Sequence, residues 1–204
     1  MKLKLFFLFS FFISNFSFSQ EIQRKGAHQQ QLEELGILKK RYPSSKTQNT
    51  TIIPLLTTST NTLSKMVFGF LPYWEYSSGA HSNMHYNLLS HIAIFNFETS
   101  SSGMLTNPSN WPWTDVINEA HSNGTKVIMV VNNFSQSEIH TLLTNSSSRN
   151  TLFSNIKNTI ITYQLDGVNI DFESFPESQK FNLITFVKDL RSSLRLVTPN
   201  AQVT

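Results

Sequence analysis

Short, mostly apolar runs that alternate with helical patterns constrain the fold of this chain more than any other feature. The apolar runs cover residues 67–73, 91–97, 126–131 and 167–172. Apolar residues recur at helical spacing in residues 114–123, 149–164 and 178–196. Strands that are apolar along most of their length are typical of parallel sheets, because helices cover both faces of such sheets. The alternation therefore predicts βα units and a parallel sheet, in the α/β class.

The helical patterns also predict where helices end and which face they bury. Gly124 follows the first helix and should stop it, because glycine adopts the backbone conformation of a helix end easily. The other two helices should bury one stripe each, made of Phe153, Ile156, Ile160 and Tyr163, and of Leu183, Val187, Leu190 and Leu194. Residues 202–204 predict the start of a fifth strand, whereas residues 75–90 show no clear pattern.

The fourth predicted strand ends in a concentration of polar side chains. Within Asp166-Gly-Val-Asn-Ile-Asp-Phe-Glu173, alternate positions are occupied by Asn169, Asp171 and Glu173. Alternate residues of a strand face the same way, so these three side chains form a polar column, and the apolar residues between them face the helices. In a βα barrel the column points into the lumen. Glu173 then lies nearest the carboxyl end of the strand, where barrel enzymes hold their catalytic groups.

Asp171 and Glu173 are suited to acid catalysis because they lie close together. Residues two positions apart on a strand are roughly 6–7 Å apart at Cα. At that range each carboxylate raises the free energy of ionising the other, and burial acts in the same direction. One member of the pair can then hold a proton near neutral pH, as a general acid must. The alternative is that both are strand-end residues that are solvated or cap a helix.

The motif resembles a known catalytic signature. Asp166-Gly-Val-Asn-Ile-Asp-Phe-Glu173 is similar to the DxxDxDxE signature of glycoside hydrolase family 18, which includes chitinases and endo-N-acetylglucosaminidases. The opening Gly69-Phe-Leu-Pro-Tyr-Trp74 also resembles the first strand of that family. Asn169, together with Phe172 before the Glu, looks most like the bacterial branch that acts on peptidoglycan and spore cortex. The resemblance covers residues 66–204.

The resemblance implies substrate-assisted retention, an exception to the usual two-carboxylate scheme. Glu173 is expected to protonate the glycosidic oxygen while the substrate N-acetyl group attacks its own anomeric carbon. Asp171 is expected to orient that acetamide, with Asn169 and Asp166 as supporting residues. The implied partner is a polysaccharide that contains N-acetylglucosamine, either chitin or peptidoglycan glycan, and no cofactor is implied.

The sequence departs from the family pattern at three points. Asn169 stands where many members have Asp; it can hydrogen-bond Asp171 but cannot share a proton with it. Asn132-Asn133 replaces the common Ser-x-Gly-Gly after the third strand. The later strands that supply a Tyr for the acetamide and an aromatic floor for the sugar are not within these residues.

The length of the chain indicates part of a barrel. A (β/α)8 barrel takes about 250 residues, and residues 66–204 hold about four βα units and the start of a fifth. The predicted fold is therefore the N-terminal half of a (β/α)8 TIM barrel, truncated near the start of strand 5. Because half a barrel leaves sheet edges open, we expect this chain to be weakly active or inactive by itself.

The first 65 residues precede the predicted catalytic domain of residues 66–204. Residues 1–19 have two lysines, a short apolar run and small residues before a cleavage site, as in a secretory signal peptide. A membrane anchor is the alternative, but the run is shorter than the roughly 20 residues that span a bilayer. Residues 20–65 are predicted to be a polar segment, either helical or solvated around Leu32, Leu35 and Leu38, and then a Ser/Thr-rich linker. We expect a secreted or periplasmic protein with no stable membrane insertion after signal removal.

Charge and cysteine content exclude other classes of function. The chain has a formal charge of +3, but residues 66–204 hold seven Lys/Arg against ten Asp/Glu. The folded part is thus acidic, which argues against a nucleic-acid partner. With no cysteine, disulfides, thiol catalysis and Cys-ligated metals are excluded.

Several other residues are weaker candidates. Tyr73 and Trp74 end the first strand, where they either stack on sugars or pack as corner aromatics. Trp111 and Trp113 could form the wall of a sugar subsite, but we expect them to pack under the loop that follows the second strand. Glu98 could face the lumen, but we expect a solvated acid in a loop. His81 and His85 have the i, i+4 spacing of two metal ligands. Because no third ligand has a recognisable spacing, we expect no metal site.

Two alternatives to a hydrolase remain open. One is a non-catalytic carbohydrate-binding relative, such as a chitinase-like lectin, or an inactive fragment. The other is a secreted barrel with unrelated chemistry, because a fold does not fix a function. Glu173 argues against the non-catalytic relative, which would not need it.

Overall fold

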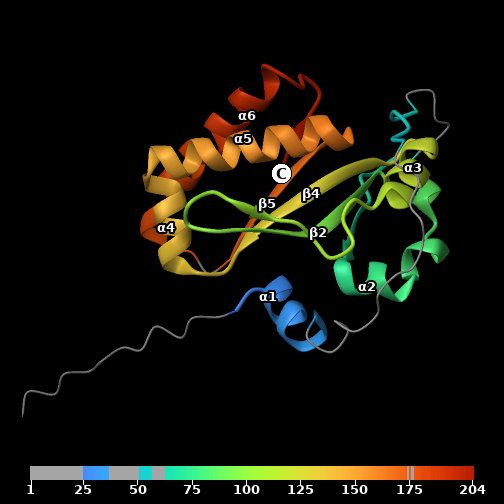
Figure 1. Cartoon of the computed structure of the whole chain (residues 1–204), viewed down its shortest axis with the longest axis horizontal. Coiled ribbons are helices and arrows are strands. Elements are labelled where there is room, and N and C mark those ends of the chain that lie inside the picture. Colours follow the sequence, from blue (N-terminus) through green and yellow to red (C-terminus); the bar gives the residue numbers. More distant parts are fainter. Residues whose placement is uncertain (1–24, 37–50, 57–62, 174, 176) are drawn as a thin grey trace, which may run out of the picture.

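The computed structural model describes residues 25–36, 51–56, 63–173, 175 and 177–204. They form a sheet with the order β1-β2-β4-β5-β6, in which every neighbouring pair is parallel, while the short β3 pairs antiparallel with β2 (Figure 1). The predicted parallel α/β sheet is confirmed. The signal peptide predicted at residues 1–19 lies outside the described residues.

The strands begin and end close to the predicted runs. Their bounds are Phe68–Pro72 for β1, His91–Thr99 for β2, Leu105–Thr106 for β3, Lys126–Asn133 for β4, Gly167–Phe172 for β5 and Gln202–Val203 for β6. Strands β2 and β4 are buried along nearly their whole length, as expected for the centre of a parallel sheet. The fifth strand predicted near residue 202 is present as β6.

Helices follow the strands. Their bounds are Tyr73–Ser78 for α2, Thr114–Ser122 for α3, Gln136–Thr144 for α4, Ser146–Tyr163 for α5 and Lys180–Arg195 for α6. The buried side chains of α3, α4, α5 and α6 pack on one face of the sheet. Short 3-10 turns at Ala80–Asn83, Tyr86–Leu88 and Glu177–Gln179 join them to the strands. In Figure 1, α5 and α6 lie together on the same side of β4 and β5.

Local sequence explains where two of these helices begin or end. The Asn145 side chain accepts hydrogen bonds from the backbone N–H groups of Ser147 and Ser148, and so caps the start of α5. Gly124 follows α3 with a φ of +71°, a conformation that glycine adopts without steric strain. The predicted stop at Gly124 is confirmed.

Apolar side chains separate into two clusters, one on each face of the sheet. The larger cluster packs between the sheet and the helices, and it includes Val168 and Phe172 of β5. The smaller cluster lies on the opposite face, which we call the inner face, and consists of Trp74, Ala93, Phe95, Ile128 and Val130. Because alternate strand residues point to opposite faces, β2 and β4 contribute buried residues to both clusters, whereas the apolar residues of β5 belong to the larger one.

The helical stripes are largely as predicted, with changes in membership. In α5 the buried residues are Leu152, Phe153, Ile156 and Ile160, and Tyr163 is partly buried. In α6 they are Phe186, Leu190 and Leu194, with Leu183 and Val187 partly buried. The sequence patterns did not predict α4 or the β2–β3 hairpin. Strand β3 has only two residues, which is too short to establish a period, whereas α4 is as long as α3 and was not assigned.

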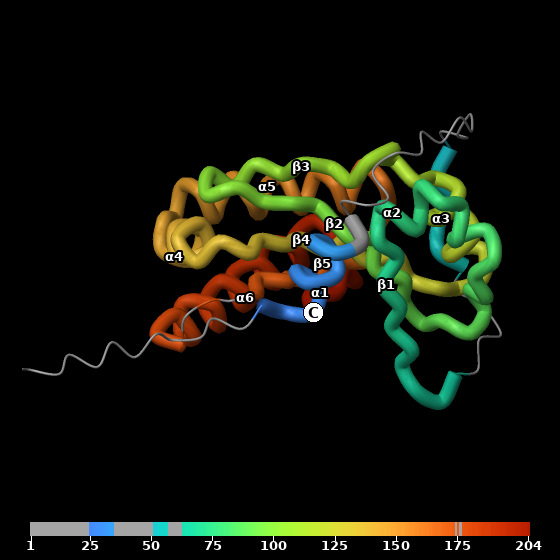
Figure 2. The backbone as a smooth tube through the Cα atoms, turned by 90° about the horizontal axis from the view of Figure 1, so that it is seen from below, coloured from blue at the N-terminus to red at the C-terminus, as the bar shows by residue number. Residues whose placement is uncertain are grey.

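Two stretches before β1 contact the sheet domain. Helix α1, Ala27–Gln31, continues into the π-helical turn Leu32–Gly36. Of the two alternatives for this region, the structure has helical turns at residues 27–36, and Leu38 lies outside the described residues. Figure 2 shows α1 lying across β4 and β5 when the molecule is seen from below. Residues 51–56 lie against α3, where the backbone N–H of Ile53 donates to Asn118 Oδ1 at 2.7 Å. Within the described part of the chain, no helix has the length and apolar character needed to cross a bilayer.

Candidate functional site

Asp171 and Glu173 lie at the carboxyl end of β5 and face away from the main core. The residue between them, Phe172, is buried in the main core with Phe186 of α6. In the sheet register Asp171 pairs with Asn132 of β4, at the end of that strand. The alternation predicted from the sequence therefore holds for these acids, and both project from the inner face.

Asn169 shares this face but interacts away from the acids. Its Nδ2 donates to Thr204 Oγ1 at 3.1 Å, so the side chain leans toward β6. The hydrogen bond that Asn169 could make to Asp171 is therefore replaced by one to the neighbouring strand. The three side chains of the predicted column project from the same face, but Asn169 hydrogen-bonds Thr204 rather than either acid.

Helix α1 packs directly on the two acids. The backbone N–H of His28 donates to Glu173 Oε1 at 3.2 Å, and that of Gln29 donates to Glu173 Oε2 at 3.1 Å. The ring Nδ1 of His28 lies 3.0 Å from Asp171 Oδ2. Sequence reasoning missed this contact entirely, because nothing in the pattern of residues 20–65 relates them to a motif more than 140 positions away.

The acids are shielded in this arrangement. The side chain of Asp171 is 13% exposed and that of Glu173 is 15% exposed. Burial raises the pKa of the Asp171 carboxyl, and the charge of Glu173 raises it further, whereas His28 lowers it through its charge and hydrogen bond. Asp171 therefore sits in the desolvated environment that the sequence predicted for the pair.

A buried pair of amides lies next to the acids on the inner face. Asn96 Nδ2 donates to Asn132 Oδ1 at 2.7 Å, and both residues are buried. Asn132 is in register with Asp171 on the neighbouring strand, so these amides belong to the same end of the sheet as the acid pair. The only sequence signal was negative, namely that Asn132 stands where the family has a Ser-x-Gly-Gly pattern.

Asp166 lies at the opposite end of β5, where its carboxylate links β5 to β4 and α3. Its Oδ2 accepts from the backbone N–H of Val127 at 2.7 Å and lies 3.0 Å from His121 Nε2. The other ring nitrogen of His121 donates to the carbonyl oxygen of Ile53 at 2.6 Å. One carboxylate thus joins β4, α3 and the stretch before β1, in keeping with the supporting role expected for Asp166.

The aromatic candidates are packed to different degrees. Trp74 is 2% exposed and packs edge-on against Phe95, while Tyr73 is partly buried and meets Trp74 edge-on. Trp113 is fully buried and stacks on Tyr76, which confirms its predicted packing role. Trp111 packs edge-on against Phe97. Tyr73 and Trp74 thus border the inner face, and a sugar-stacking role for them stays a prediction.

The other polar candidates do not join the acid pair. His81 pairs with Asp115 across 3.0 Å, and His85 is exposed beyond the 3-10 turn rather than on the same helix. Glu98 is exposed, as expected of a solvated acid. Among the residues described, one group of three could offer metal ligands, His28, Asp171 and Glu173, whose ligand atoms lie within 4.8 Å of one another. All three already hydrogen-bond within the cluster, and we interpret it as a hydrogen-bonded contact.

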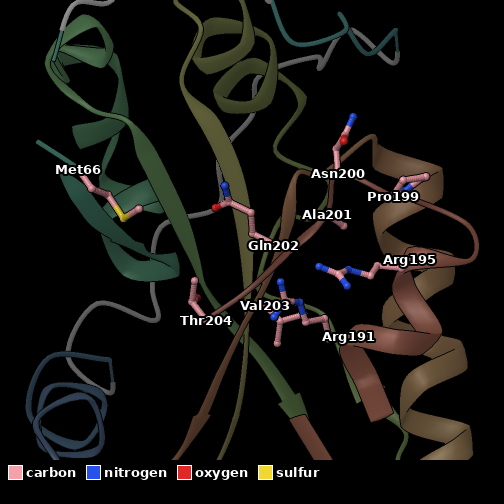
Figure 3. Close-up of a pocket in the computed structure, with 9 residues that line it drawn as sticks. All are labelled: Met66, Arg191, Arg195, Pro199, Asn200, Ala201, Gln202, Val203 and Thr204. Carbon is pink, nitrogen blue, oxygen red and sulfur yellow. The ribbon is translucent and has the colours of Figure 1, made fainter. Parts of the chain in front are cut away.

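A separate pocket lies along β6 and away from the acids. It has a volume of about 430 Å³ and lies between β6, the end of α6 and Met66. Figure 3 shows the side chains of Arg191 and Arg195 reaching from α6 toward β6. Because Met66 precedes β1 and Gln202 begins β6, the pocket is near the amino-terminal ends of the strands. It therefore does not contribute to the acid site.

Comparison with known proteins places this geometry in a family. Residues 44–202 match the model of glycosyl hydrolases family 18. A search of the curated proteins gave no match. Similar solved structures include the spore cortex-lytic enzyme SleL of Bacillus cereus, at 21% identity and TM-score 0.57, with 63% of this chain and 31% of that chain covered. A chitinase from Bacteroides thetaiotaomicron is 24% identical with a TM-score of 0.58, and 68% of this chain and 45% of that chain are covered. The GH18 chitinase of Cycas revoluta in complex with (GlcNAc)3 is 16% identical with a TM-score of 0.60, and the coverage is again 68% of this chain and 45% of that chain.

These solved structures share the fold of this chain over part of their length. The chain spans less than half of each of them. The shared part has the parallel sheet and covering helices of the N-terminal half of a (β/α)8 barrel, which confirms the predicted fold class.

Proposed function

Because the chain belongs to glycosyl hydrolases family 18, we propose that it supplies the catalytic acids for hydrolysis of β-1,4 bonds in polysaccharides that contain N-acetylglucosamine. The substrate is chitin or peptidoglycan glycan. The observation that carries the proposal is the position of Asp171 and Glu173, together on the inner face at the carboxyl end of β5. Barrel enzymes hold their catalytic groups at that end of the strands.

Glu173 is the proposed general acid and Asp171 the proposed partner of the substrate acetamide. Glu173 gives its proton to the glycosidic oxygen as that bond breaks, and the acetamide oxygen forms a bond to the anomeric carbon. Asp171 orients the acetamide and stabilises the positive charge of the oxazoline-like intermediate. Glu173 then takes a proton from the water that opens the intermediate, so the configuration is retained.

The surroundings of Asp171 support this division of roles. A carboxylate in a partly desolvated site interacts with a nearby cationic intermediate more strongly than it would in water. Asn132 and Asn96, which are buried beside Asp171, hold polar groups in fixed positions on the same face. The names of the similar structures, chitinases and a spore cortex-lytic enzyme, agree with both proposed substrates. We also propose export by the leader predicted at residues 1–19.

The proposal is tested by measuring cleavage of labelled chitooligosaccharides and of purified cell-wall glycan. We expect slow turnover, so the assay needs high protein concentration and long incubation. Replacing Glu173 in Glu173→Gln removes the transferable proton at nearly constant shape, and turnover should fall by about 10²–10⁴-fold. Glu177→Gln is the matched control, because Glu177 begins the next 3-10 turn, its side chain is 88% exposed and it pairs with Lys180 at 3.2 Å.

Other outcomes point to other functions. Cleavage that persists in Glu173→Gln would contradict the assigned acid. Binding of oligosaccharide without cleavage would indicate a carbohydrate-binding relative. Neither binding nor cleavage of either glycan would indicate unrelated chemistry on the same fold.

A further inference from the structure

Residues 25–36, which we call the N-terminal segment, occupy the space directly in front of the proposed acid. Both carboxylate oxygens of Glu173 accept a backbone N–H from the segment, at 3.2 Å and 3.1 Å. A glycosidic oxygen that is to receive a proton from Glu173 must approach one of these oxygens to hydrogen-bond distance. The segment already holds that position with its own backbone.

The approach of the segment to Glu173 depends on a glycine. A Cβ built on Gly26 would overlap the Glu173 carboxyl group at Cδ and at both oxygens. Gly26 also provides the carbonyl that accepts from the N–H of Gln30 and begins the helix. Any larger residue at position 26 would therefore force the helix away from the acid, or the acid away from the helix.

The side chains of the segment fill the rest of the inner face. The His28 ring lies 3.0 Å from Asp171 and packs against Phe70 and Phe95, with ring centroids 4.5 Å and 5.3 Å away. One residue thus blocks both the partner acid and part of the aromatic surface.

Farther along the segment, Leu32 packs against the inner-face cluster that contains Trp74. The contacts of the segment therefore run from the acids to the aromatic end of β1. A saccharide in the proposed site would need the same groups.

We propose that the N-terminal segment is an intramolecular inhibitor that covers Asp171 and Glu173 and leaves when a glycan binds. The inhibitory role rests on the proposed function, whereas the covering of the acids can be measured without it. The docked and glycan-bound states exclude each other because they use the same atoms of Glu173. The apparent affinity for glycan is then the intrinsic affinity multiplied by the fraction of molecules in which the segment is released.

The test uses the full chain with Gly26→Ala and measures how fast carboxyl groups react with a water-soluble carbodiimide and an amine. One tryptic peptide, residues 158–180, contains both acids and also Glu177 as an exposed internal reference. We expect Glu173 to be protected in the wild type and to be labelled about tenfold faster in Gly26→Ala. Gln31→Ala, at an exposed helix position that does not contact the acids, is the control and should label like the wild type.

Turnover of a fluorogenic chitooligosaccharide is measured on the same proteins. Faster labelling of Glu173 together with faster turnover in Gly26→Ala supports the inhibitor. Equal labelling of Glu173 in the wild type and Gly26→Ala overturns it, whatever the turnover. If labelling rises but no variant cleaves or binds glycan, the covering of the acids stands and the proposed function fails. If labelling rises and a wild type that cleaves is not accelerated, the inhibitory role is wrong.

Discussion

The two ends of β5 carry the same pair of side chains in very different settings. At the amino end, Asp166 lies 3.0 Å from His121. At the carboxyl end, Asp171 lies 3.0 Å from His28. The His121 side chain is fully buried and the carboxylate also accepts a backbone N–H of β4, whereas the His28 side chain is 24% exposed and belongs to a separate segment.

The difference shows that distance alone does not tell a permanent contact from a displaceable one. The two carboxylates are similarly exposed, at 16% for Asp166 and 13% for Asp171, so the difference lies in their partners. The His121 ring is fully buried with a partner on each nitrogen, and Asp166 also accepts a backbone N–H of β4. The Asp171 contact joins the sheet to a segment that can leave without opening the core. A partly exposed ion pair of this kind is worth little, whereas removing one partner of a buried pair is strongly destabilising.

The largest difference between the two ends should appear in unfolding experiments on Asp166→Ala and Asp171→Ala. Asp166→Ala leaves His121 and the Val127 N–H without their acceptor, and should lower the free energy of unfolding by about 3 kcal/mol. Asp171→Ala should change it by less than about 1 kcal/mol. Urea denaturation followed by far-UV circular dichroism measures both. Equal losses for the two variants would mean that the two ends are equivalent after all.

The two ends should also respond to pH with opposite signs. At the amino-terminal edge of the sheet, where His91 begins β2, burial lowers the pKa of His91, although its hydrogen bond with Gln202 acts against this. The unfolded chain then binds the proton first, so stability is lost as pH falls through the ordinary histidine value of 6.5. At the carboxyl end, burial raises the pKa of Asp171, so its contribution is present below the ordinary value of 3.8 and is lost as pH rises through the raised value.

Denaturation from about pH 4 to about pH 8 separates these effects in two variants. His91→Gln should reduce the loss of stability that occurs as pH falls below 6.5. Asp171→Asn should remove the loss of stability that occurs as pH rises and the carboxyl ionises. A further check is carboxyl NMR titration of Asp171 in His28→Phe, which keeps an aromatic ring beside the carboxyl and removes the charge and the hydrogen bond. The charge and hydrogen bond of His28 lower the pKa of Asp171, so the titration should move to higher pH in the variant. An unchanged titration would contradict this contact in solution.

The smallest effect is expected from His28→Ala on global stability. The segment contacts the domain through a few partly exposed groups, so the free energy of unfolding should change by about 0.5 kcal/mol or less. His140→Ala, an exposed histidine on α4, is the matched control. A loss comparable to that of Asp166→Ala would show that the N-terminal segment is part of the folding core.

The sequence predicted the sheet and the acid pair because both follow from local periodicity. The runs that became β2, β4 and β5 are apolar enough to be assigned without tertiary information, and strand alternation placed Asp171 and Glu173 on one face. The β2–β3 hairpin was missed because β3 has only two residues, and α4 was missed although it is as long as α3. The partner of Asn169 was missed because it lies on another strand, at Thr204.

The contact between α1 and the acids could not be predicted from a single sequence. It consists mainly of backbone N–H groups, which every residue except proline carries, and these have no sequence signal. The side-chain identities that the contact uses are those of Gly26 and His28. A single glycine and a single histidine in a polar segment have many ordinary explanations. The buried amides Asn96 and Asn132 were overlooked for a similar reason, since their pairing depends on the register between β2 and β4.

The attachment of residues 51–56 to α3 determines how far the N-terminal segment, residues 25–36, can move from the acids once it is released. The stretch is fixed to the domain through Asn118 and His121, and residues 37–50 separate it from Gly36. A tether of that length reaches at most about 50 Å. A released segment therefore remains at an effective concentration in the millimolar range near the acids. Dilution of the protein would not free the site, whereas a single cut in the tether would make release permanent.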